Sequence, residues 1–137
     1  MIFYAPGDDV GPLEEWGLTD PVSDYVILRG APRTFGRLDA GGPGHETRFG
    51  IWRCTAGAFE CTEQGDELMT ILAGRCRLID HATGDARELA PGDSLFLRDG
   101  SRVTWDMREE VTKVFFGRKP GGFQALSRPV PPRRIRG

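Results

Sequence analysis

Residues 59–74, FECTEQGDELMTILAG, decide how this chain folds. In an extended strand successive side chains point to opposite faces, so Phe59, Cys61 and Glu63 share one face. Phe59 is the obvious core residue of the three, which predicts that Cys61 and Glu63 face the interior with it. A Gln-Gly-Asp turn follows, and the next strand begins at Glu67 with an apolar run behind it. The stretch therefore predicts two strands joined by a tight turn, the first of which carries a thiol and a carboxylate toward the interior.

The same rhythm of short strands and tight turns continues through the chain. From residue 47 onward the predicted strands arrive about every ten residues, at 47–55, 58–63, 67–74, 75–80, 86–90, 93–98, 102–107 and 111–118. Another strand is predicted at 25–30, residues 31–39 hold a further candidate, and 13–17 (LEEWG) allow a single helical turn. No long stretch has the 3.6-residue period of a helix. This spacing is typical of sandwiches, barrels and jelly rolls, so we predict an all-β fold.

The length of 137 residues fits one domain. We expect residues 1–46 to form an N-terminal arm with leading strands that complete the sheets, 47–118 to form the barrel, and 119–137 to form an extended C-terminal arm. The C-terminal arm is rich in arginine and proline, a composition that favours a solvated tail over docking on a neighbouring subunit.

Charge and cysteine content exclude several classes of function. With 18 basic and 20 acidic side chains the net charge is -2, so no overall field favours nucleic acid or an anionic membrane. We see neither a secretory leader nor an apolar run long enough to span a membrane, and expect a cytoplasmic protein. Cys54, Cys61 and Cys76 lack CxxC spacing, which predicts three reduced, buried thiols.

The positions of three glycines and one glutamate match the spacing of two sequence motifs of a known protein family. Glu67 is followed after six residues by Gly74, and Gly92 and Gly100 stand at the matching places of a second motif. Over residues 47–118 the chain resembles the cupin superfamily, and within it the small single-domain branch of ureidoglycine aminohydrolase-like and ethanolamine-utilisation cupins. The resemblance implies a double-stranded β-helix, the jelly-roll cupin barrel, which usually dimerises and has a pocket in its mouth.

The usual metal-binding histidines of that family are missing. With three residues before the glutamate, the His-x-His places hold Cys61 and Glu63; with four, they hold Glu60 and Thr62. Strand alternation favours the three-residue spacing. The second motif departs from the family pattern as well, with Arg98, Val103 and Met107 in place of proline, histidine and asparagine.

A lysine stands where a core residue is expected. Lys113 lies between Val111 and Phe115 on one face of the last strand. Members of the resembled branch commonly carry a tryptophan and a lysine at the places of Trp105 and Lys113. Pointing into the barrel, Lys113 would neutralise Glu67 or Glu63; the alternative is an edge-strand lysine that prevents aggregation.

Our first interpretation is a homodimeric cupin that binds a small polar metabolite in the barrel mouth without a metal or other cofactor. Glu67 and Lys113 would anchor the metabolite, and if the protein is an enzyme they would carry proton transfer or isomerisation. The pocket would be lined by Cys61, Glu63, Met69 and Trp105. The sequence does not decide between an enzyme and a binding protein.

Two alternatives remain open. The first is a metal-dependent hydrolase or dioxygenase whose rebuilt ligands would be Glu67, Glu63, Cys61 and His45. The second is a non-catalytic accessory protein of a catabolic pathway, with an effector in the same pocket.

Overall fold

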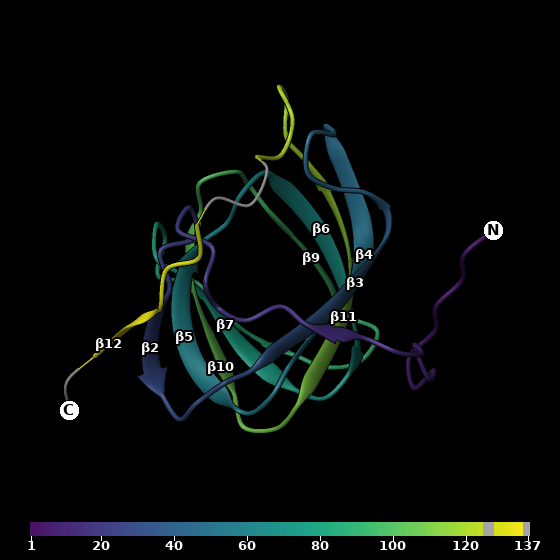
Figure 1. The fold of residues 1–137 in the computed structure, drawn as a ribbon. Helices are drawn as coiled ribbons and strands as arrows, with labels where there is room; N and C mark the ends of the chain where they lie inside the picture. The colour runs from purple at the N-terminus through teal and green to yellow at the C-terminus, as the bar shows by residue number, and fades with distance from the viewer. Residues whose placement is uncertain (125–127, 136–137) are drawn as a thin grey trace.

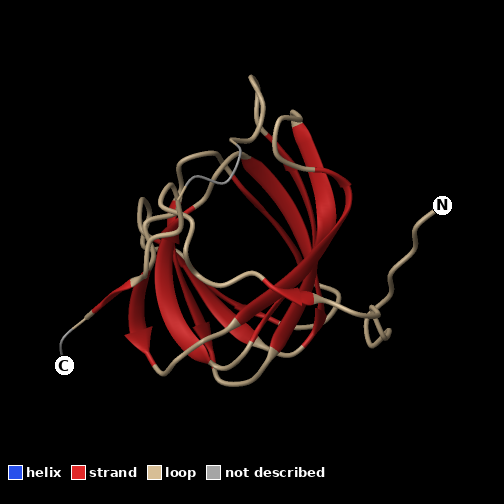
Figure 2. Ribbon diagram, in the orientation of Figure 1, coloured by secondary structure: helices blue, strands red, loops and turns tan. Residues whose placement is uncertain are grey.

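The computed structural model describes residues 1–124 and 128–135. Within this part of the chain the secondary structure is strands and loops, with no helix, and therefore none that could cross a membrane (Figure 2). The strands form two sheets that curve around a common interior (Figure 1).

Sheet A supplies the wall on which most of the site is built. It contains six strands in the order β1-β3-β4-β11-β6-β9, and all its pairs are antiparallel. Their bounds are β1 Glu14–Glu15, β3 Thr34–Gly41, β4 Thr47–Cys54, β11 Val111–Arg118, β6 Asp66–Ala73 and β9 Ser94–Leu97.

Sheet B forms the opposite wall. Its order is β12-β2-β5-β10-β7-β8, and only the outermost pair, β12 with β2, is parallel. Their bounds are β12 Arg133–Arg134, β2 Val26–Arg29, β5 Gly57–Thr62, β10 Arg102–Met107, β7 Cys76–Asp80 and β8 Ala86–Leu89.

The connections between the sheets make the barrel a jelly roll. From β4 to β7 each strand lies in the sheet opposite its predecessor, and β8 to β11 alternate in the same way. Hairpins that cross between two sheets in this manner close the barrel around one core. The prediction of an all-β jelly roll is confirmed, and every segment predicted as a strand from residue 47 onward contains one.

Gly74 shows why the turn spacing is restrictive. It joins β6 to β7 with a φ of 79°, a conformation that side chains disfavour. A β-carbon at this position would also collide with the backbone of Glu110, in the loop before β11. The glycine therefore lets the β6–β7 connection pass close to the loop before β11.

One detail at each chain end differs from the sequence prediction. Residues 13–17 form no helical turn; Glu14 and Glu15 pair with β3 instead, because Trp16 docks in the space above Gly36 and its backbone N–H donates to Thr34 O at 2.9 Å. The described part of the C-terminal arm is not a free tail. It adds β12 to sheet B, and the N–H of Ile135 donates to Ile27 O at 3.0 Å.

The core lies between the sheets. Its largest fully buried side chains include Trp105, Phe59, Met69, Ile71 and Met107. A second, smaller cluster of Val10, Ile51 and Leu72 lies on the outer face of sheet A, under the N-terminal arm.

Candidate functional site

An open pocket of about 540 Å³ lies in the barrel mouth. Both sheets, the N-terminal segment and the segment after β11 contribute to its wall. The residues that carry its chemistry are Arg48, Trp52, Cys61, Glu63, Glu67, Trp105, Lys113 and Phe115.

A buried ion pair forms the base of this pocket. Lys113 Nζ lies 2.8 Å from Glu67 Oε2, and each side chain is only 6% exposed. The two come from neighbouring strands, since β11 lies between β4 and β6 in the middle of sheet A. Lys113 is therefore not an edge-strand lysine, and it faces the interior as strand alternation predicted.

Aromatic rings surround the lysine. Its ammonium lies 4.7 Å from the Trp52 ring centroid, 4.8 Å from that of Trp105 and 6.0 Å from that of Phe115. Ring faces attract a cation most strongly when water is excluded, so this cage offsets part of the cost of burying the ammonium. The Met69 sulfur, 3.6 Å from the same nitrogen, lies beside the cage in the core rather than in the pocket lining.

Cys61 and Glu63 lie side by side near the pair. The thiol points at Glu63 Oε1 over 3.8 Å. Desolvation, followed by the nearby Glu67 charge, raises the pKa of Glu63 even though Lys113 favours its ionised form. Burial, followed by the Glu63 charge, raises the pKa of Cys61 well above its ordinary value, so the thiol stays protonated and is a poor nucleophile at neutral pH.

The outer part of the pocket contains an arginine that sequence reasoning missed. The Arg48 guanidinium stacks on Phe123, with its central carbon 4.1 Å from the ring centroid. The Phe123 ring is buried between Gly65 and Gly117, where a β-carbon at either glycine would crowd it. Strand alternation on β4 could have placed Arg48 on the inner face, but the long-range Phe123 contact could not be inferred.

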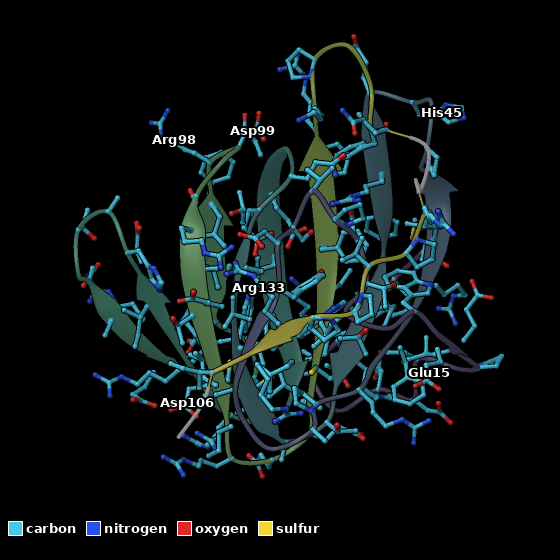
Figure 3. All side chains as sticks on the ribbon, turned by 60° about the vertical axis from the view of Figure 1, so that its left-hand side comes forward. Glu15, His45, Arg98, Asp99, Asp106 and Arg133 are labelled. Carbon is cyan, nitrogen blue, oxygen red and sulfur yellow. The ribbon has the colours of Figure 1, made fainter. Side chains whose placement is uncertain are left out.

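The residues present do not fit the metal that the cupin pattern implies. Glu67 is already held by an ammonium, and Cys61 would have to lose its proton to ligate. His45 is exposed on the loop before β4 and points away from the barrel (Figure 3). Across residues 1–124 and 128–135 no group of three or more His, Cys, Asp or Glu side chains is placed to hold an ion. The structure thus brings together Glu67, Glu63 and Cys61 but not His45.

Comparison with known proteins gives one family. A family model described as the EutQ-like cupin domain matches residues 41–115, more than half of the chain. No curated protein matches the sequence.

Several solved structures share the fold. The EutQ protein of Clostridium difficile is similar with a TM-score of 0.56 and 14% identity, over 64% of this chain and 69% of that one. A protein of unknown function from Pseudomonas syringae pv. tomato has a TM-score of 0.62 and 21% identity, over 80% and 45%. A structure reported with the DMSP lyases RdDddP and RnDddQII has a TM-score of 0.53 and 14% identity, over 71% and 53%. At these identities the likeness shows the fold alone.

The buried ion pair predicts an asymmetric response to mutation. Lys113→Met leaves the Glu67 carboxylate without its cation and should lower the free energy of unfolding by about 3–5 kcal/mol, measured by urea denaturation. Replacing both partners, Lys113→Met with Glu67→Gln, should cost less than Lys113→Met alone. The exposed pair of Arg77 and Glu88, at 3.6 Å, is the control, and its loss should cost less than about 1 kcal/mol. Equal losses at the two pairs would contradict this account.

The raised pKa of Glu63 predicts a pH-dependent loss of stability. A proton held more tightly in the folded state stabilises the protein below the ordinary value near 4.5, and this contribution is lost as pH rises through the raised pKa. Glu63→Gln imitates the protonated form, so its free energy of unfolding should exceed that of the wild type increasingly from pH 4.5 to pH 8. Each tenfold change in proton affinity corresponds to about 1.4 kcal/mol. Glu88→Gln, at an exposed site, should show no such trend, and a constant difference for Glu63→Gln would refute the raised pKa.

Proposed function

The chain belongs to the EutQ-like cupin family, and we propose that it binds a small polar molecule in the barrel mouth on Glu67 and Lys113. The observation that carries this proposal is the caged ion pair, which lies in an open pocket rather than in the sealed core. A cation and an anion side by side, walled by tryptophans, can bind a polar group and stack its flat neighbours.

The same pair suits metal-free proton transfer. We propose that Glu67 takes a proton from a carbon next to a carbonyl group, while the Lys113 ammonium stabilises the oxygen on which negative charge develops. Where the deprotonated carbon also carries a hydroxyl group, the hydroxyl proton passes to the former carbonyl oxygen and the proton held by Glu67 passes to the former carbonyl carbon. The result is an isomerisation with no net change in protons or electrons. We assign the base to Glu67 because it lies beside the Lys113 ammonium, and the acid to Glu63 because burial raises its pKa.

Deuterium exchange tests the proposed chemistry. Small hydroxyketones and 2-oxo acids incubated with the protein in D₂O should lose the proton next to the carbonyl faster than in buffer, as followed by ¹H NMR. Glu67→Gln should reduce this rate by about 100-fold or more, because it removes the base. Glu88→Gln should leave it unchanged.

Two further measurements, thermal stability with each compound and metal content, separate this mechanism from its alternatives. Thermal stabilisation by a compound without exchange would favour a non-catalytic, effector-binding protein. Stoichiometric metal in protein purified without chelator, lost in Glu67→Ala, would favour the metal-dependent alternative and overturn the metal-free mechanism.

We also propose that the protein is a homodimer that pairs through the outer face of sheet A. Cross-strand neighbours form an apolar row there, from Phe49 through Phe116 and Leu68 to Phe96, and the last three are 45%, 51% and 55% exposed. The exposed apolar residues 1–3 of the same chain project from this side of the barrel (Figure 1). In a two-fold dimer each copy would offer both its row and its N-terminal residues to the other, so both uncovered apolar features would be buried at once.

Sedimentation equilibrium tests the dimer. The wild type should have twice the mass of one chain, and a variant carrying Phe116→Thr and Leu68→Thr should be monomeric, because threonine suits a strand but removes the apolar contact. Val22→Thr, which removes an exposed apolar side chain beside sheet B, is the matched control. A monomeric wild type, or a variant that stays dimeric, would contradict the proposed interface.

A further inference from the structure

One cation in the pocket, Arg48, has no ion-pair partner among the residues that the structure describes. The Arg48 Nε is buried and has no hydrogen-bond partner among the described residues, while one terminal nitrogen makes only a long contact of 3.4 Å with Gln64 O. The described residues also provide no ion-pair partner for this arginine, whereas Lys113 has Glu67. A buried donor without an acceptor costs free energy unless a ligand satisfies it.

The guanidinium is held rigidly rather than left to find an acceptor in solvent. Its face rests on Phe123, and the N–H of Phe123 donates to His45 O at 2.8 Å, which ties that ring to the loop before β4. Gly117, the strand partner of Arg48, leaves the space that the stack occupies. A planar donor group fixed in this way is preorganised for a planar anion.

The two cations of the pocket lie at different depths. Lys113, Phe115 and Gly117 follow one another on the inner face of β11, and Arg48 is paired with Gly117. The Phe115 ring centroid lies 6.0 Å from both the Arg48 guanidinium and the Lys113 ammonium. The Phe115 ring therefore lies between Lys113, which Glu67 neutralises, and Arg48, which Glu67 does not neutralise.

We propose that Arg48 binds the carboxylate of the ligand, so that the pocket is specific for small carboxylic acids with a polar group at the opposite end. The carboxylate accepts hydrogen bonds from the guanidinium, the middle of the molecule lies along Phe115 and the tryptophans, and the far polar group reaches the Lys113–Glu67 pair. This inference rests on the proposed binding function and assigns its ligand class. Because Glu67 already neutralises Lys113, Arg48 is the cation of the pocket that is left for the carboxylate of a ligand.

Matched acids and amides test the assignment. The probes are ω-hydroxy acids of three to six carbons and their primary amides, which have the same shape but no charge, titrated into ¹⁵N-labelled protein. The readouts are the Nε–H signals of Arg48, Trp52 and Trp105. At least one acid should bind with an affinity about 10- to 100-fold higher than that of its amide, the difference expected for charge-assisted hydrogen bonds.

Variants then separate a direct contact from a structural role. Arg48→Gln should abolish the preference for acids without weakening the binding of amides, and Arg48→Lys, which keeps the charge but loses the planar fork, should restore part of it. Arg53→Gln is the control: Arg53 lies on the same strand, and its Nε donates to Thr112 Oγ1 at 3.0 Å. The tryptophan signals report whether each variant keeps the fold.

The outcomes distinguish this inference from the binding function on which it rests. Equal binding of acids and amides, or a preference that survives in Arg48→Gln, overturns the carboxylate assignment and leaves the binding proposal standing. If neither the acids nor the amides shift the indole signals of Trp52 and Trp105, both the carboxylate assignment and the binding proposal are overturned.

Discussion

The rest of the site depends on burying one ammonium next to one carboxylate. Moving either charge out of water costs several kcal/mol, and only close pairing and further favourable contacts offset this desolvation free energy. The 2.8 Å contact between Lys113 and Glu67 supplies the pairing, and the tryptophan cage supplies the rest. Central strands can hold such a pair because their backbones are fixed on both sides by neighbours. Sheet A thus holds the two side chains close enough to offset the cost of burying them, and the ion pair makes the barrel interior polar.

The pair also places a fixed positive charge in a pocket where the cupin pattern implies a metal ion. The cupin pattern leads one to expect imidazoles where Cys61 and Glu63 stand, and a divalent ion would be the main positive charge of that site. Here Lys113 provides a fixed positive charge beside the glutamate, and neither the thiol nor the second carboxyl needs to be ionised. A protonated neighbour can donate a hydrogen bond, which a metal-bound carboxylate cannot do.

Local periodicity predicted most of the barrel and part of the site. The strands from residue 47 onward could be located because Gly and Asp mark each turn, and alternation within FECTE put Cys61 and Glu63 on the inner face. The same rule would have put Arg48 there, but a half-apolar strand gives no reason to single out one arginine. The pairing of β12 with β2, the docking of Trp16 on Gly36 and the stack of Phe123 on Arg48 connect segments distant in sequence. No local pattern encodes such contacts, because each depends on how distant segments of the chain come together.

The position of β11 in sheet A has a consequence for the order of folding. It is the last strand of the barrel in sequence but lies between β4 and β6, so a chain that emerges from its N-terminus must leave the middle of the sheet unfilled until residue 118 has been made. During that interval Glu67 has no ammonium beside it and is more stable in water than in an apolar interior. Lys113 can neutralise Glu67 only when β11 takes its place between β4 and β6, and the same strand completes sheet A. The pocket and the closed barrel therefore form together, and a nascent chain that lacks this strand has neither.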